Sequence, residues 1–544
     1  MIAIGHDEPP ATLVVHDEVL HRIDPRLFGQ FFERASFGEP GPEAFVDSKT
    51  GRLPESIMAK MEAMEIPLVR FPGGTDVDYI DWRDMIDNVP GRPGPRPVTV
   101  GHSGRSITNY FGYDEYFAVR DRMGWETILV VNLLDGLARK RPLEEAAQLA
   151  AGLVAYANAP AGATLPESMP DWPAVRAKNG HPEPFGIQFV QIGNEIFLRR
   201  IREAVKEATG LDGEALARWY IEVYTAYIQE IRKVDPSLPI IIDHWSVTGH
   251  WKMVLGDPYI REQVTYIARH KYAPGPSNQI SRDEESVETD SLTDKEWWWA
   301  WATMPGEYDG AGQNLAFGLT LNELSELGYL VAATEWNWNG WNWRDINTSF
   351  EAPAAAGIGA AGWLQGMMRQ GDLIRLGNQS MLLAANWQFG AIQGDPAGEG
   401  DPYYSPQGSA TTFYRRHHGG DLLRTTLEGV PSMPQPYHVG WGPPIEKAAL
   451  LDVLVTADKT TIFIHALNRS FDRDLPLKID LTALGPIGER AQHHTFTCKL
   501  KSDSGHGASK GMAQVGRREI EISSTHTVML PARTASIFAV PRTR

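Results

Sequence analysis

An alternation of short apolar runs with amphipathic stretches between residues 24 and 390 is the feature that most constrains this chain. The expected strands are residues 27–33, 66–71, 127–132, 185–195, 239–243, 265–272, 330–336 and 382–387. The expected helices between them include residues 54–64, 113–123, 142–158, 212–234, 314–327 and 353–369. Strands that alternate with helices favour a parallel sheet, and about eight such units predict a TIM barrel. The sequence therefore predicts an α/β fold with a (β/α)8 barrel over residues 24–390.

The remainder of the chain has a different texture. Glycine and proline punctuate residues 394–443, and short β-rich runs follow as far as residue 540. Such spacing predicts a C-terminal β-sandwich. Residues 11–20 form a further expected strand before the barrel, and we expect it to complete the sandwich. The predicted accessory domain thus comprises residues 1–23 plus 391–544.

The charge of the chain argues against two classes of partner. A formal net charge of -17 provides no basic excess to neutralise phosphates, so we expect neither nucleic acid nor an anionic membrane as a partner. Residues 1–10 show no signal peptide, which favours the cytoplasm over secretion with a leader absent from this chain. The single cysteine, Cys498, is expected to be buried in a strand. His417-His418 and the scattered aspartates lack metal-ligand spacing, and no phosphate loop is visible, so neither a metal nor a cofactor is expected.

Two glutamates follow expected strands at an abrupt change from apolar to polar residues. Glu195 ends Gly193-Asn194-Glu195, and Glu335 ends the run from Leu330. Reacting groups of such barrels lie at the carboxyl ends of strands, and paired carboxylates are what glycosidic cleavage requires. A separation of about 5–5.5 Å would give retention and a wider one inversion. The neighbouring Asn194 could bind a sugar 2-hydroxyl. The alternative, two glutamates that merely close their strands, explains these neighbours poorly.

Other strand-end residues are candidate substrate contacts. His270 and Tyr272 lie two apart, hence on one side of a strand, where the tyrosine hydroxyl could orient a nucleophilic carboxylate. A packed core pair is the alternative. Arg70 could lower the pKa of a neighbouring carboxylate, and Glu33 could accept bonds from sugar hydroxyls. A structural ion pair is the alternative for these two.

Tryptophans are clustered. One cluster comprises Trp297-Trp298-Trp299 and Trp301, and the other comprises Trp336, Trp338, Trp341 and Trp343. Rigid aromatic faces suit stacking on sugar rings, whereas the plainer interpretation is core packing. Both interpretations stay open for the first cluster. A cleft is favoured for the second, which directly follows Glu335, so Trp336 and Trp338 are candidate substrate platforms.

Taken in order, these motifs resemble those of glycoside hydrolase family 51, a clan A family. The resemblance covers about residues 20–390 and rests on Gly29-Gln30-Phe31-Phe32-Glu33, Arg70-Phe71-Pro72-Gly73-Gly74, residues 109–115, Gly193-Asn194-Glu195, His270-Lys271-Tyr272 and Glu335-Trp336-Asn337. It implies Glu195 as general acid/base, Glu335 as nucleophile, retention of configuration, frequent oligomers and no metal. Most members are α-L-arabinofuranosidases, and some act on β-1,4-glucans or xylans.

The chain departs from the family pattern at two positions. Members usually have Pro-Gly-Gly-Asn, where the asparagine binds the sugar, but this chain has Thr75. Gln388 is the candidate counterpart of a family glutamine that binds the same sugar. The expected function is a retaining α-L-arabinofuranosidase-like hydrolase of plant cell-wall polysaccharide. An endo-acting β-1,4-glucanase or xylanase and a non-catalytic carbohydrate-binding barrel are the alternatives. The sugar, linkage and mode of attack stay open.

Overall fold

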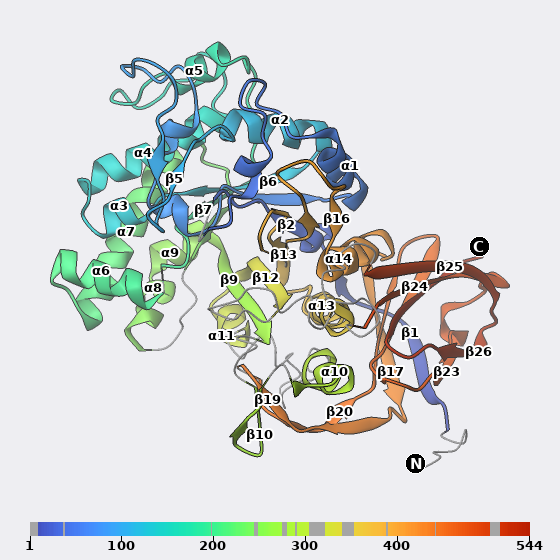
Figure 1. The fold of residues 1–544 in the computed structure, drawn as a ribbon. Coiled ribbons are helices and arrows are strands. Elements are labelled where there is room, and N and C mark those ends of the chain that lie inside the picture. Colours follow the sequence, from blue (N-terminus) through green and yellow to red (C-terminus); the bar gives the residue numbers. More distant parts are fainter. Residues whose placement is uncertain are drawn as a thin grey trace.

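The computed structural model describes residues 9–35, 38–196, 198–243, 249–274, 280–288, 291–303, 321–339, 353–387, 390–440, 442–500 and 512–543 (Figure 1). Its centre is a closed barrel of parallel strands, which confirms the predicted TIM barrel. The barrel strands are β2 (Gly29–Phe31), β3 (Leu68–Phe71), β6 (Glu126–Val131), β7 (Phe189–Ile192), β8 (Ile240–Ile242), β9 (Val264–Pro274), β12 (Leu330–Asn339) and β13 (Ile374–Ser380). They follow one another around the barrel in chain order, and β13 pairs with β2 to close it.

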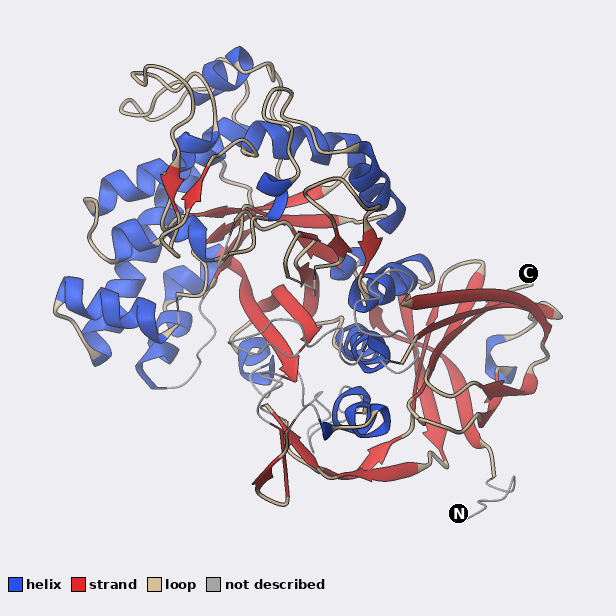
Figure 2. Ribbon diagram, viewed as in Figure 1, coloured by secondary structure: helices blue, strands red, loops and turns tan. Residues whose placement is uncertain are grey.

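Helices surround the outside of the barrel (Figure 2). The longer ones are α1 (Glu55–Met64), α2 (Tyr113–Met123), α4 (Leu143–Asn158), α6 (Arg199–Thr209), α7 (Gly213–Val234), α13 (Pro353–Arg369) and α14 (Pro406–Arg416). The shorter ones are α3 (Leu134–Leu137), α5 (Trp172–Lys178), α8 (Lys252–Gly256), α9 (Pro258–Gln263), α10 (Asp294–Ala302) and α11 (Leu321–Glu326). Part of the helix expected over 314–327 lies outside the described residues. Among the described residues, no helix is long and apolar enough to cross a bilayer.

The barrel interior changes from apolar to polar along the strands. A layer of inward side chains includes Leu68 of β3, Phe189 of β7 and Ala268 of β9. Because strand side chains alternate, the next inward positions are two residues further on. These positions hold Arg70, Gln191 and His270, all buried. The polar layer therefore lies towards the carboxyl ends of the strands, where catalytic groups of such barrels are found.

The closing strand is not the one that the sequence predicted. Residues 382–387 were expected to form it, but β13 (Ile374–Ser380) does, and only Leu383–Ala384 pair later, as β14 outside the barrel. The run Ile374-Arg-Leu-Gly-Asn-Gln-Ser resembles a loop because it is rich in polar residues. Two of these residues have hydrogen-bond partners inside the protein: Gln30 donates to Gln379 at 3.0 Å across the strand pair, and Asn378 donates to the Gln30 carbonyl at 2.9 Å.

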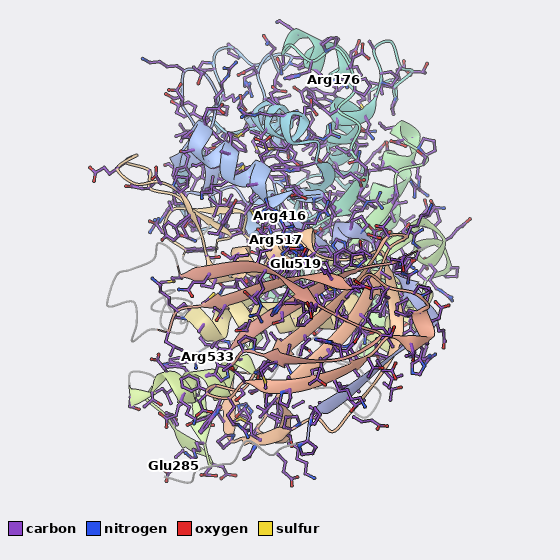
Figure 3. All side chains as sticks on the ribbon, turned by 90° about the vertical axis from the view of Figure 1, so that its right-hand side faces the viewer. Arg176, Glu285, Arg416, Arg517, Glu519 and Arg533 are labelled. Carbon is purple, nitrogen blue, oxygen red and sulfur yellow. The ribbon has the colours of Figure 1, made fainter. Side chains whose placement is uncertain are left out.

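The C-terminal part forms a nine-stranded sheet ordered β25-β24-β27-β22-β21-β17-β1-β23-β26. Its strands are β1 (Ala11–Arg22), β17 (Asp421–Glu428), β21 (Leu451–Ala457), β22 (Thr461–Asn468), β23 (Leu475–Asp480), β24 (Arg490–Cys498), β25 (Ala513–Glu521), β26 (Thr525–Leu530) and β27 (Thr534–Pro541). The sheet curls so that β26 returns to contact β22 around a core of its own, consistent with the predicted sandwich. Figure 3 views this sheet from outside. The N-terminal strand is part of it, as predicted; the exact domain boundaries stay predictions.

Short strands form small additional sheets. They are β4 (Thr99–Val100), β5 (Ser106–Ile107), β10 (Ile280–Arg282), β11 (Glu285–Ser286), β14 (Leu383–Ala384), β15 (Ile392–Gln393), β16 (Tyr403–Tyr404), β18 (Ser432–Gln435), β19 (Tyr437–Val439) and β20 (Ile445–Ala449). Helix α13 lies between the barrel and the C-terminal sheet and contacts both (Figure 1). Its small residues permit this position, because a Cβ at Gly359 would lie 1.8 Å from the Trp338 indole nitrogen and one at Gly357 would lie 2.7 Å from Cys498 Sγ.

Candidate active site

Arg70 of β3 is the centre of a polar cluster at the carboxyl ends of the barrel strands. Its side chain is fully buried and donates three hydrogen bonds: Nε to Gln191 (2.9 Å), Nη1 to Glu335 (2.8 Å) and Nη2 to Asn194 (2.6 Å). The guanidinium also lies over the Phe31 ring at 4.7 Å. The planar guanidinium thereby holds Gln191 of β7, Asn194 of the following turn and Glu335 of β12 in fixed positions relative to one another.

Glu335 is held through both of its oxygens. Oε1 accepts from Arg70, and Oε2 accepts from the Tyr272 hydroxyl at 2.7 Å. The same hydroxyl is hydrogen-bonded to Ser380 Oγ at 2.6 Å. Burial, followed by the negative charge of Glu335, raises the pKa of Tyr272 well above its usual value, so the phenol remains a donor. The arrangement leaves Glu335 little freedom to rotate, which suits a nucleophile that must meet one carbon atom.

A bulge in β12 turns Glu335 into the barrel. On β9, Ala268 and His270 are two residues apart, but their partners on β12, Ala332 and Glu335, are three residues apart. Ala332 faces the interior, so an uninterrupted strand would place residue 334 inward and Glu335 outward. The extra residue reverses this, and bulges commonly re-aim a side chain beside an active site.

Glu195 follows β7 and is the more exposed of the two glutamates, with 21% of its side chain accessible against 7% for Glu335. Its Oε1 lies 3.2 Å from His270 Nδ1, and His270 Nε2 lies 3.0 Å from the Thr334 hydroxyl. Burial alone would raise the pKa of Glu195, but the hydrogen bond and charge of His270 outweigh it and hold that pKa below its usual value.

The charge state of His270 follows from the same cluster. Burial would lower its pKa, but the surrounding carboxylates, Glu335 first and then Asp243 and Glu195, hold it above its usual value. The three carboxylates therefore favour the protonated form of His270.

The two glutamates meet at one ring nitrogen of His270: Nδ1 lies 3.2 Å from Glu195 Oε1 and 3.5 Å from Glu335 Oε1. A carboxylate oxygen of Glu195, one of Glu335 and a ring nitrogen of His270 are all within 4.8 Å of one another. Carboxylate oxygens at most 4.8 Å apart are consistent with the short carboxyl separation of retaining glycosidases, about 5–5.5 Å, and fall short of the roughly 6.5–9.5 Å of inverting ones. The Asn194 Nδ2 group is buried and donates to no described residue, which leaves it available to a sugar hydroxyl.

The same three side chains have the spacing of a candidate metal site. However, Oε1 of Glu335 already accepts from the Arg70 guanidinium, so a cation there would be close to a fixed positive charge. The expectation that no metal is required stays a prediction.

Known proteins resemble this chain in sequence and in fold. Residues 60–284 match the family model described as "Alpha-L-arabinofuranosidase 1 domain". An intracellular exo-alpha-(1->5)-L-arabinofuranosidase of Streptomyces lividans is 27% identical over 266 residues, which are 46% of this chain and 35% of that protein. This chain thus spans about a third of that relative's length.

Solved structures extend the likeness to the whole chain. An alpha-L-arabinofuranosidase of Thermotoga maritima has a TM-score of 0.71 at 20% identity and covers 98% of this chain and 100% of that one. A family 51 alpha-L-arabinofuranosidase of Bifidobacterium longum has a TM-score of 0.69 at 17% identity, with 98% and 100% covered. The resemblance to glycoside hydrolase family 51 is confirmed. At these identities, the solved structures show the fold.

At Thr75 the chain departs from the family 51 pattern, and the structure shows what surrounds the substituted residue. Its hydroxyl accepts from Arg200 Nη2 of helix α6 at 3.1 Å. Arg200 is exposed and its charge helps to lower the pKa of Glu195. The carboxylate of Glu33 packs on Gly74, where a Cβ would lie 1.9 Å from Glu33 Oε1. Gln388, the candidate for the family glutamine, lies outside the described residues.

The tryptophans predicted as platforms occupy the core instead. Trp336 and Trp338 are fully buried and lie against Trp363 of α13, with ring centroids 6.4 and 5.9 Å apart. Strand alternation explains this burial. Because Glu335 faces into the barrel, residues 336 and 338 face outward, against the outer helix. Trp298 and Trp301 of α10 are likewise buried. Trp341 and Trp343 lie outside the described residues.

Sequence reasoning missed several residues that support the site: Asp78, Gln191, Arg200, Asp243, Thr334 and Ser380. Two of them carried a usable signal. Gln191 lies two positions after inward Phe189, and Asp243 follows Ile240–Ile242 as Glu195 follows its own strand. Ser380 was missed with its strand. Neither Asp78 nor Arg200 has a local pattern that predicts its contact.

Proposed function

We propose that the chain is a retaining glycoside hydrolase of the α-L-arabinofuranosidase type that acts on plant cell-wall polysaccharide by double displacement. The observation that carries the proposal is the pair of carboxylates, Glu195 and Glu335, within 4.8 Å of each other at the carboxyl ends of barrel strands. The proposal of an arabinofuranoside substrate is supported by the family 51 resemblance, because sequence relatives of this chain are named arabinofuranosidases.

In the first step, the Glu335 carboxylate attacks the anomeric carbon while Glu195 donates a proton to the departing oxygen, so that one C–O bond forms and one breaks. Arg70 and Tyr272 hold the nucleophile in position through their bonds to its two oxygens. The Asn194 amide faces the sugar and donates to its 2-hydroxyl, a bond that strengthens in the transition state.

In the second step, Glu195 removes a proton from water, which attacks the same carbon and releases Glu335. Glu195 thereby regains from water the proton that it gave to the leaving group, and His270 holds its carboxyl group in place through the contact with Oε1. The greater exposure of Glu195 fits this role, since the leaving group and the water both arrive on its side.

Hydrolysis of an aryl α-L-arabinofuranoside tests the proposal. Glu335→Ala should lower kcat/KM by roughly 10⁴-fold or more, and NMR should show the α-anomer as the first sugar released by the wild type. Glu230→Gln, at a buried glutamate of α7 remote from the barrel mouth, is the matched control and should stay active. Full activity of Glu335→Ala, or first release of the β-anomer, would contradict the assignment.

An endo-acting β-1,4-glucanase or xylanase is the second candidate. It is favoured by Thr75, whose hydroxyl is engaged by Arg200 where family members have a sugar-binding asparagine. Assays with arabinan, xylan and a soluble glucan separate the two candidates. Oligosaccharides from xylan or glucan, without arabinose from arabinan, would support the second.

We further propose a cytoplasmic location. The support is that the Streptomyces lividans relative is named intracellular. Assembly into homo-oligomers stays a prediction from the family resemblance.

A further inference from the structure

The turn that carries Glu195 has an unusual backbone. Gly193 has φ +82° and Glu195 has φ +48°, so a non-glycine residue occupies the left-handed region at the position of the candidate acid/base. Such a conformation is strained for a residue with a Cβ and persists where surrounding groups hold it. The turn therefore requires contacts that fix its main chain.

Two buried aspartates supply those contacts from separate elements. The Asn194 N–H donates to Asp78 Oδ2 at 3.0 Å, and the Glu195 N–H donates to Asp243 Oδ2. Asp78 ends a 3-10 helix (Thr75–Asp78), whereas Asp243 directly follows β8. Their exposed fractions are 1% and 0%. Consecutive N–H groups of a left-handed turn form a concavity suited to anions, and here each N–H has its own carboxylate.

The two aspartates differ in their other contacts. Asp78 Oδ1 accepts the N–H groups of Leu133 and Leu134 at 2.7 and 3.1 Å, so Asp78 also fixes the segment after β6. Asp243 Oδ1 accepts no hydrogen bond from the described residues. Within the part of the chain that the structure describes, the Asp243 carboxylate thus accepts from one main-chain N–H, that of Glu195.

A carboxylate at residue 243 is electrostatically unfavourable in itself. Burial, together with the charge of Glu195, raises the pKa of Asp243 to about 7, and burial raises that of Asp78 to about 6. An apolar side chain at this position would avoid the cost of burying a charged carboxylate, but it would leave the Glu195 N–H buried without an acceptor. The position is thereby suited to holding Glu195 rather than to packing alone.

We propose that Asp243 is a positioning residue for the general acid/base: by accepting the Glu195 N–H, it fixes the direction in which the Glu195 carboxyl faces the leaving oxygen, with Asp78 holding the preceding amide. The inference rests on the proposed glycosidase function. It assigns Asp243 no contact with substrate, so its effect must appear through the chemistry of Glu195.

The dependence of rate on the leaving group tests this role. A misplaced acid slows substrates whose departing oxygen needs a proton, but it spares those with a good leaving group. Asp243→Ala should lower kcat/KM about 100-fold for a methyl or phenyl α-L-arabinofuranoside, as expected if the Glu195 carboxyl group moves by about 1 Å. For the 2,4-dinitrophenyl compound, the same variant should lower kcat/KM by less than about threefold. Asp243→Asn keeps an acceptor oxygen and should restore most of the lost rate.

Asp243→Leu, which fills the site without an acceptor, serves as the second variant if the alanine protein does not fold. Asp114→Ala is the matched control, because Asp114 is also a buried aspartate whose pKa burial raises to about 7, but it contacts Tyr156 on the outer helices. It should lower thermal stability without a change in leaving-group dependence.

Two results would overturn the proposal in distinguishable ways. If wild type hydrolyses the whole series but Asp243→Ala and Asp243→Leu slow every substrate equally, Asp243 is only structural and the glycosidase function stands. If wild type hydrolyses none of the glycosides, the proposed function fails, and the positioning role with it.

Discussion

Replacing Arg70 by lysine keeps the positive charge but removes the planar fork. In the structure, Arg70 is fully buried and donates to Gln191, Glu335 and Asn194 at 2.6–2.9 Å. A lysine ammonium can keep the bond to Glu335, but Gln191 and Asn194 then lose a buried donor. Each lost partner costs about 1–3 kcal/mol, so Arg70→Lys should lower the free energy of unfolding by about 2–6 kcal/mol.

The same change should lower kcat/KM by about 100-fold, because Glu335 and Asn194 are no longer fixed to one group. Thermal unfolding and hydrolysis of an aryl α-L-arabinofuranoside measure the two effects. Arg176→Lys is the control: Arg176 of α5, labelled in Figure 3, is equally buried, but it donates only to main-chain carbonyls of residues 156, 159, 181 and 182, none of which belongs to the Arg70 cluster. It should lose stability and keep activity. An Arg70→Lys protein within about threefold of wild-type kcat/KM would refute the reasoning.

Other changes give separate expectations. Tyr272→Phe removes a 2.7 Å bond to Glu335, and loss of a bond to a charged group, about 1.5–3 kcal/mol, should lower kcat/KM about 10- to 150-fold in steady-state assays. Because the fold holds the pKa of His270 above 6.5, its stabilising proton is fully present below that pH and is lost as pH rises through the folded value. The thermal advantage of wild type over His270→Asn should therefore shrink above about pH 6.5, and a constant advantage would contradict this. Gly359→Ala places a Cβ 1.8 Å from the Trp338 indole and should destabilise the protein by about 1–3 kcal/mol in chemical unfolding, whereas unchanged stability would show that α13 can shift.

Much of the barrel could be predicted from local sequence. Buried parallel strands are short apolar runs, and Phe189–Ile192 and Ile240–Ile242 show this clearly. The change to polar residues at the strand ends pointed to Glu195 and Glu335, which the structure brings together. The closing strand β13 escaped prediction because Asn378 and Gln379 have their hydrogen-bond partners on neighbouring strands, and those partners exist only in the folded barrel.

The direction of side chains was harder to predict than the position of strands. The bulge between Ala332 and Glu335 arises from pairing with β9, and the local sequence of β12 does not predict it. It decides that Glu335 faces the site and that Trp336 faces the outer helix. Likewise, the contact of Asp78 with Asn194 joins residues 116 positions apart in the chain, so local patterns could not predict it.

The location of β1 within the C-terminal sheet has a consequence for biosynthesis. This strand pairs with β17 on one side and β23 on the other, so its partners lie roughly 400 residues later in the chain. At about 5–20 residues per second, the ribosome needs roughly 20–80 s to deliver them. During that interval Leu13 and Val15, which are fully buried in the finished protein, have no native partner to cover them. Nascent chains should therefore present the apolar residues of β1 to chaperones until β17 and β23 have been synthesised.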